Sequence, residues 1–139
     1  MTEPRALVAG QARGRVLVLE EPLSFWGGID PATGEVIDVR HPQRGAIVTG
    51  RVLVMPAGRG SSSSSSVLLE AVRAGTAPAA IVLGEADPIL ALGAIVAREL
   101  YGVALPVVVS DPAGLSDAAE VEVRATAGAT EIVAAEDPG

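Results

Sequence analysis

Cysteine and lysine are both absent from this chain, and only three of its 139 residues are aromatic. Without cysteine, the chain cannot form a disulfide or offer a thiolate to zinc or to an iron–sulfur cluster, so any such metal must be held by a partner. Without lysine, Schiff-base catalysis and a lysine-dependent phosphate loop are excluded. With so few aromatic residues, the core must consist of valine, leucine, isoleucine and alanine, which suits a buried sheet covered by helices.

Positive charge is scarce as well. Ten arginines face 17 acidic residues, and the formal net charge is -7. Nucleic-acid binding depends on clustered positive charge, so we expect no nucleic-acid partner. No apolar run approaches the ~20 residues that span a bilayer, and residues 1–5 lack an apolar signal core, so we expect a cytoplasmic protein with no membrane partner. The length predicts a single domain over residues 1–139.

The hydrophobic pattern alternates between strands and helices. Short apolar runs bounded by glycine, proline or acidic residues predict strands at 15–19, 51–55, 79–83 and 106–109. Amphipathic segments predict helices at 62–74, with Gly75 as the C-cap, and from Pro88 to about Leu100. Two antiparallel strands should close the fold after Ala118, whereas residues 21–50 have turn chemistry and should form a structured loop. The pattern predicts an α/β fold with a parallel or mixed sheet.

Six serines, residues 61–66, follow Gly58, Arg59 and Gly60 directly. Because they lie between an apolar strand and an amphipathic helix, we expect an ordered turn there rather than a flexible serine-rich linker. One serine is enough to cap a helix. The excess of hydroxyls, together with Arg59 and the positive end of the helix dipole, favours binding of a carboxylate or phosphate and stabilisation of an alkoxide. A helix that is merely well capped remains the alternative.

Other residues offer less chemistry. A hydrolase triad is not expected, because His41 is the only histidine and no Gly-x-Ser-x-Gly motif occurs. We expect His41 to support the loop structure, with proton transfer as the alternative. Phe25 and Trp26 stand beside two glycines, and they form either a hydrophobic plug that holds the loop on the sheet or a wall that faces substrate or partner.

Four motifs together resemble the small subunit of the aconitase X family over about residues 10–110. In order they are EPLSFWGGIDP at 21–31, GRGSSS at 58–63, GTAPAAI at 75–81 and PI at 88–89. The resemblance implies a swivelling β/β/α domain like the mobile last domain of aconitase, with a mixed sheet and flanking helices. It also implies a large-subunit partner that holds an iron or iron–sulfur centre and most of the substrate pocket, while this chain binds no metal.

The resemblance also implies a site. In aconitase the corresponding loop runs Gly-x-Gly-Ser-Ser, and its first serine is the base that removes a proton from carbon, which makes Ser61 the general base here. Aconitase has an arginine where this chain has Ser63, so the carboxylate contact falls to Arg59 or to the large subunit. The expected substrate-binding residues are Gly58, Arg59, Gly60, Ser62, Ser63, Ser65, Ser24 and Trp26.

Two substrate classes occur in that family. Archaeal members dehydrate 5-phosphomevalonate, and bacterial members dehydrate cis-3-hydroxy-L-proline to pyrroline-2-carboxylate. The uninterrupted serine run and the SFWGG motif resemble the bacterial branch. The resemblance thus implies a hydro-lyase, active only with its large subunit, in which Ser61 takes the proton alpha to the carboxylate while iron on the partner polarises the leaving hydroxyl. The rivals are a swivelling phosphocarrier, whose phosphorylated histidine this loop lacks, and a non-catalytic anion-binding assembly module.

Overall fold

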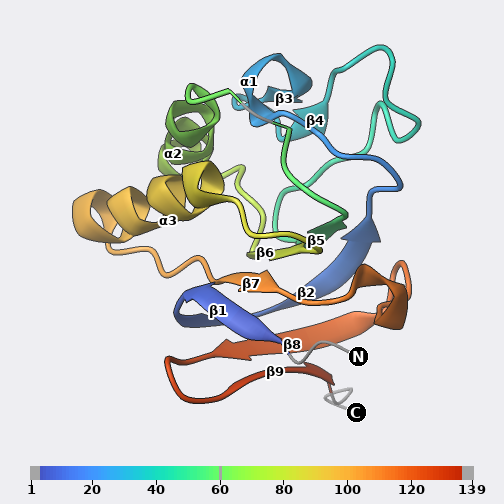
Figure 1. The fold of residues 1–139 in the computed structure, drawn as a ribbon. Helices are drawn as coiled ribbons and strands as arrows, with labels where there is room; N and C mark the ends of the chain where they lie inside the picture. The colour runs from blue at the N-terminus through green and yellow to red at the C-terminus, as the bar shows by residue number, and fades with distance from the viewer. Residues whose placement is uncertain (1–3, 60, 136–139) are drawn as a thin grey trace.

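The computed structural model describes residues 4–59 and 61–135, and they form a mixed α/β fold (Figure 1). One sheet has seven strands in the order β1-β7-β6-β5-β2-β8-β9, and a two-stranded sheet pairs β3 with β4. The strands are β1 (Arg5–Val8), β2 (Gly10–Val18), β3 (Ile29–Asp30), β4 (Glu35–Val36), β5 (Val52–Met55), β6 (Ala80–Leu83), β7 (Val107–Val109), β8 (Glu120–Ala125) and β9 (Thr130–Ala134). The helices are α1 (Phe25–Gly28), α2 (Ser64–Ala74) and α3 (Pro88–Tyr101), with a 3-10 turn η1 (Pro112–Gly114).

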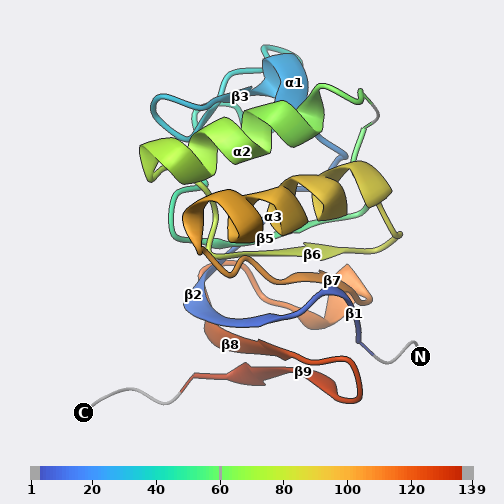
Figure 2. The ribbon, with the colours of Figure 1, turned by 90° about the vertical axis from the view of Figure 1, so that its left-hand side faces the viewer.

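The centre of the large sheet is parallel, as the alternation of strands and helices predicts. β2 pairs with β5, β5 with β6 and β6 with β7, all in parallel. β1 and β8 add antiparallel partners to β7 and β2, and β9 extends β8. Figures 1 and 2 show α2 and α3 side by side on one side of the parallel strands, with β8 and β9 on the other. The arrangement confirms the expected β/β/α layers.

Buried residues on both sides of the parallel strands account for these layers. Alternate strand residues point to opposite faces of a sheet. On β5, Leu53 and Met55 join the cluster beneath the helices, whereas Val52 and Val54 join a second cluster that includes β8 residues. Because both faces are covered, the central strands read as continuous apolar runs rather than as alternating ones.

Most of the expected elements are confirmed, with differences at some boundaries. The closing strands are present as the antiparallel pair β8 and β9, and Gly75 ends α2 with a φ of 78°, a left-handed conformation that favours glycine. However, α2 begins at Ser64 rather than at residue 62, because the side-chain oxygen of Ser61 accepts the backbone N–H of Ser63 and so favours a turn over helix. The sequence pattern did not predict β1 or the small β3–β4 pair.

Among the described residues, no helix is both long and apolar enough to cross a membrane. The longest, α3, has 14 residues, fewer than the ~20 that a bilayer requires.

Candidate active site

Loops from three parallel strands meet at the start of α2. Leu23, after β2, forms an isolated parallel bridge with Gly58, after β5, and the Arg59 N–H approaches the Leu23 carbonyl oxygen at 3.4 Å. Asp87, after β6, lies beside Gly58 and Ser61 around a small recess. All three loops follow the carboxyl ends of parallel strands, which is the edge of an open α/β sheet where ligands usually bind.

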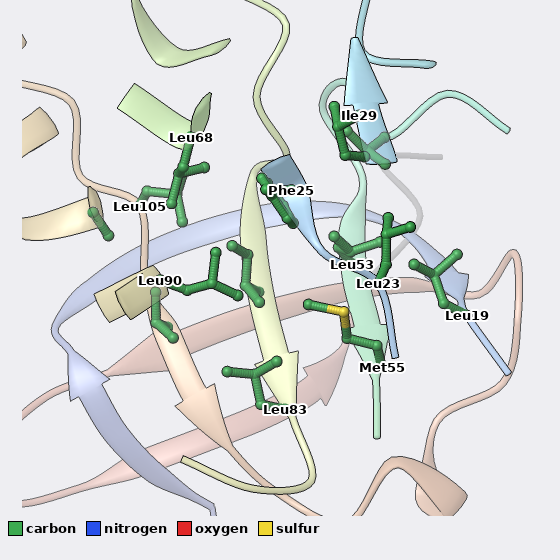
Figure 3. Packing of buried hydrophobic residues seen from close by; sticks show 14 of the residues in the cluster. Leu19, Leu23, Phe25, Ile29, Leu53, Met55, Leu68, Leu83, Leu90 and Leu105 are labelled. Atoms are coloured by element: carbon green, nitrogen blue, oxygen red, sulfur yellow. The ribbon is translucent and has the colours of Figure 1, made fainter. Parts of the chain in front are cut away.

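A rigid apolar base supports these loops. Figure 3 shows the side chains of Phe25, Met55 and Leu90, from α1, β5 and α3, pointing toward one another with Leu23 nearby. All four are buried members of the core beneath the helices. The polar residues of the loops therefore stand on closely packed side chains, which limits their movement relative to one another.

Ser61, the expected base, is half-buried just before α2. Its Oγ accepts the backbone N–H of Ser63 at 3.3 Å, and its carbonyl oxygen accepts the N–H of Ser64 at 2.9 Å. The Ser61 oxygen thus lies at the N-terminal end of a helix with a backbone donor directed at it. Such an environment stabilises negative charge on oxygen. Gly60, also expected in the site, lies outside the described residues.

The next two serines remain open to solvent. Ser62 and Ser63 are exposed, and the side chain of Ser63, the N-cap residue, makes no capping hydrogen bond. The backbone N–H groups of Ser65 and Ser66, in the first turn of α2, have no hydrogen-bond acceptor within the described part of the chain. Both hydroxyls and first-turn N–H groups are therefore available to an anionic ligand, as expected for a helix N-terminus.

Ser64 and Ser65 instead join α2 to neighbouring segments. The buried Ser64 Oγ accepts the Trp26 N–H at 3.2 Å and lies 3.3 Å from the Ser24 Oγ. The Ser65 hydroxyl donates to the Ile89 carbonyl oxygen at 2.9 Å. Gly93 lets the two helices approach closely, since a Cβ there would lie 3.0 Å from the Ser65 carbonyl oxygen. The contribution of Ser24 and Ser65 to substrate binding remains a prediction.

The two neighbouring aromatic rings face opposite environments. Phe25 is 1% exposed and forms the hydrophobic plug, whereas Trp26 is 59% exposed. A backbone kink follows directly after them, with ψ of 114° at Trp26 and φ of 79° at Gly27. Glycine favours this positive φ because it lacks a Cβ. Phe25 therefore acts as the hydrophobic plug. Trp26 points outward, as a residue that faces substrate or partner would.

Arg59 supplies positive charge beside Ser61. The residue is exposed, and its guanidinium forms no ion pair with any of the residues that the structure describes. It borders the same recess as Ser61 and Asp87. An exposed guanidinium without a carboxylate partner is suited to bind a carboxylate or phosphate.

Asp87 is a polar member of this region that the sequence analysis did not identify. One carboxylate oxygen, Oδ1, caps α3 by accepting the N–H groups of Ile89 at 2.9 Å and Leu90 at 3.3 Å. The other oxygen, Oδ2, lies so close to Gly58 that a Cβ there would be only 1.7 Å away. The signal available in the sequence was Asp87 followed by Pro88, an N-cap residue before a proline at the first helical position.

His41 serves the loop rather than the site. It is buried, its Nε2 lies 3.0 Å from the Glu21 carbonyl oxygen, and its Nδ1 accepts the Gln43 N–H at 3.0 Å. Since a carbonyl oxygen can only accept, the hydrogen resides on Nε2, and both ring nitrogens are engaged with backbone groups. The geometry supports the structural role expected for His41.

The recess does not by itself form a substrate pocket. It is bordered by residues from all three loops and from the start of α3, and it has no space for a water-sized molecule. As formed by the described residues, the recess is therefore too small to hold a substrate. The residues of this chain do not fit an iron–sulfur cluster, because cysteine is absent from its sequence. The described residues also contain no group of three or more histidine or acidic side chains able to hold a metal ion.

Comparisons with known proteins identify the relatives of this chain. A family model described as the aconitase X swivel domain matches residues 1–132. The chain is 59% identical over 104 residues to a cis-3-hydroxy-L-proline dehydratase of Pseudomonas aeruginosa, a match that covers 75% of this chain and 18% of that protein. It is 46% identical over 128 residues to the phosphomevalonate dehydratase small subunit of Methanothermobacter thermautotrophicus, covering 89% of this chain and 93% of that subunit.

A solved structure resembles the whole fold. The crystal structure of Thermococcus kodakaraensis aconitase X in its holo-form matches with a TM-score of 0.84 and 37% identity, covering 97% of this chain and 100% of that chain. In contrast, this chain spans less than a fifth of the length of the Pseudomonas dehydratase that it matches. The family match, the sequence identities and the shared fold agree, and the chain belongs to the aconitase X swivel domain family.

Proposed function

We propose that this chain is the small subunit of a two-part hydro-lyase that dehydrates cis-3-hydroxy-L-proline to pyrroline-2-carboxylate, with Ser61 as the general base. The observation that carries the assignment of the base is the position of the Ser61 Oγ, which accepts the Ser63 N–H at the start of α2. The 59% identity to the Pseudomonas dehydratase supports the choice of substrate. A single swivel domain over residues 1–139 and a cytoplasmic location remain predictions.

The proposed step is an elimination. The Ser61 oxygen takes the hydrogen on the carbon alpha to the carboxylate as a proton, and the electron pair of that C–H bond forms a carbon–carbon double bond. The C–O bond to the hydroxyl on the next carbon breaks, and that oxygen leaves as water after it gains a proton. The cyclic enamine then isomerises to pyrroline-2-carboxylate.

A neutral serine is a weak base, so its alkoxide must be stabilised. The Ser63 N–H and the positive end of the α2 dipole provide fixed donors and positive potential at the Ser61 oxygen. Fixed dipoles act most strongly where water is excluded. Since this chain leaves Ser61 only half-buried, we infer that a large subunit closes over the site.

The proposed partner would also complete the binding site. Arg59 and the first-turn N–H groups of α2 would hold the substrate carboxylate, and the exposed ring of Trp26 would face the substrate or the partner. An iron or iron–sulfur centre held by the large subunit would supply Lewis-acid chemistry. No residue of this chain is assigned to that centre.

Phosphomevalonate dehydration is the second candidate. One observation favours it, because the match to the Methanothermobacter small subunit covers 93% of that subunit, whereas the match to the Pseudomonas dehydratase covers a small part of a longer protein. The higher identity to the hydroxyproline enzyme, 59% against 46%, favours the first candidate.

Reconstitution tests the proposal. We would express the chain with the large subunit from the same organism and measure the conversion of cis-3-hydroxy-L-proline and of 5-phosphomevalonate by the assembly and by each part alone. We expect the assembly to dehydrate hydroxyproline and the isolated chain to be inactive. Conversion of phosphomevalonate alone would establish the second candidate, and full activity of the isolated chain would contradict the two-part proposal.

A further inference from the structure

Asp87 does more than end a loop. Its Oδ1 bonds the N–H groups of Ile89 and Leu90, which caps α3, while its Oδ2 is packed against the backbone of Gly58. The contact with Gly58 is not needed for capping, because one oxygen serves both N–H groups. The same carboxylate therefore joins the loop after β6 to the loop after β5, next to the recess that Ser61 borders.

Asp111 provides an internal comparison. It also precedes a proline and caps the turn that follows, with its Oδ1 accepting the Ala113 N–H at 3.0 Å. Asp111 does not border the recess at Ser61. Capping explains what Asp111 does, whereas Asp87 has an additional contact with a glycine of the predicted site.

The close approach explains why position 58 is glycine. Any other side chain would place its Cβ 1.7 Å from the Asp87 Oδ2, so the carboxylate would have to shift. Its hydrogen bonds through Oδ1 to the N–H groups that begin α3 oppose that shift. Gly58 is in turn bridged to Leu23, and the Arg59 N–H bonds the Leu23 carbonyl. A displacement of Gly58 would thus also move Arg59 relative to Ser61.

We propose that Asp87 is a positioning residue for the reaction assigned to Ser61. Its carboxylate fixes the backbone at Gly58 through shape and close packing, and it contacts neither the substrate nor the reacting atoms. The part of this inference that concerns turnover rests on the proposed function. The part that concerns position does not, because it follows from contacts within the chain.

Four variants test the inference: Asp87→Ser, Asp87→Asn, Gly58→Ala and the double variant Gly58→Ala with Asp87→Ser. Asp111→Ser is the matched control, because it makes the same change at another Asp-Pro cap, one that begins a 3-10 turn away from the recess. The measurements are kcat and KM of the assembly with its large subunit, and the amide chemical shifts of Ser61 and Ser63 by NMR on the chain alone. Thermal unfolding then reports the cost of each change to the fold.

We expect Asp87→Ser to keep the cap of α3, since serine caps helices well. It should still lower kcat about tenfold with little change in KM, because the loop at Gly58 is no longer held in place and a misplaced group at the site slows the chemistry. Asp87→Asn, which keeps the shape, should stay near the wild-type kcat, as should Asp111→Ser. Gly58→Ala should lose activity and shift the Ser61 and Ser63 amides. The double variant should recover part of the activity and part of the wild-type amide shifts, because the smaller serine leaves room for the new Cβ.

Three results would overturn the inference. Asp87→Ser could match Asp111→Ser in kcat and in amide shifts, which would leave Asp87 a helix cap only. The double variant could be no better than Gly58→Ala in shifts and thermal unfolding, which would disprove the contact. Loss of activity in Asp87→Asn without a shift of the Ser61 amide would assign the role to charge instead. If the wild-type assembly dehydrates neither substrate, the proposed function fails, while the shifts and unfolding data still decide the question of position.

Discussion

Ser61, Ser62 and Ser63 lie before α2 and keep their hydroxyls near solvent, whereas Ser64 and Ser65 lie in its first turn and bond to other segments. The residue type is the same in both halves of the run, so the difference arises from where the helix begins. In the first turn of α2, Ser64 and Ser65 face neighbouring segments, whereas Ser66 faces outward. The comparison shows that a uniform serine run can combine open hydroxyls, which we propose as part of the site, with residues that hold the helix in place.

The largest effect is expected from a substitution in the first half of the serine run, and it is an effect on turnover. Ser61→Ala removes the proposed base and should lower kcat by at least ~10²-fold, while the loss of a cap-like hydrogen bond should cost only ~1 kcal/mol of stability. Steady-state kinetics of the assembly and exchange of the substrate alpha hydrogen with solvent measure the first effect. Ser66→Ala, at an exposed serine that is not among the expected site residues, is the matched control, and normal exchange in Ser61→Ala would refute the assignment of the base.

In the second half, Ser64→Val should affect the fold more than any other serine substitution. It removes the acceptor of the Trp26 N–H and the partner of the Ser24 hydroxyl, and a donor left unpaired in a partly buried place costs about 1–3 kcal/mol. Urea unfolding of the isolated chain measures this loss. Equal stability of Ser64→Val and Ser62→Ala would show that the two halves do not differ in this way.

Ser65→Ala should have a smaller effect of the same kind. The substitution removes one hydrogen bond to the Ile89 carbonyl oxygen, and a typical intramolecular hydrogen bond contributes about 0.5–1.5 kcal/mol. Hydrogen exchange of the α2 and α3 amides should show local loss of protection at the contact between the helices. An unchanged exchange pattern would mean that Gly93 packing alone holds the helices together.

Mild acid should distinguish neither half of the serine run, because the carboxyl groups with a lowered pKa, Glu70 and Glu122, lie outside it. Hydrogen bonds from Arg124 and then Gln11 hold the pKa of Glu122, on β8, below its usual value of 4.5. A lowered folded-state pKa means that this carboxylate stabilises the fold above the unfolded pKa and that the stabilisation is lost as the pH falls through the folded-state pKa. Thermal unfolding of Glu122→Gln and wild type from about pH 6 downward should therefore converge slightly in acid, with a small effect because the carboxylate is partly open to solvent.

The sequence predicted the parts of the fold that depend on local patterns. The apolar runs of β5, β6 and β7 and the glycine that ends α2 follow from residues adjacent in the chain. β1 was missed because Arg5–Val8 is a short run whose pairing with β7 depends on a partner near the other end of the sequence. Local pattern carries little information about such pairing.

The candidate site was predictable in part because the glycines and serines of 58–66 are adjacent in the sequence. Their position at the N-terminus of a helix could therefore be predicted. Whether a hydroxyl faces outward or bonds to Trp26 depends on where α2 starts, and that start was misplaced by two residues. Asp87 escaped notice because its contact with Gly58 exists only when loops from two different strands come together.

β1 and β2 are consecutive in the chain, yet β7, β6 and β5 lie between them in the sheet. β1 therefore has no edge to pair with until β7, which lies far along the chain from it, is in place. Long-range pairing of this kind slows folding because a large loop must close before the contact forms. We therefore expect the pairing of β1 with β7, like that of β2 with β8, to form later than the contacts among the parallel strands and their helices.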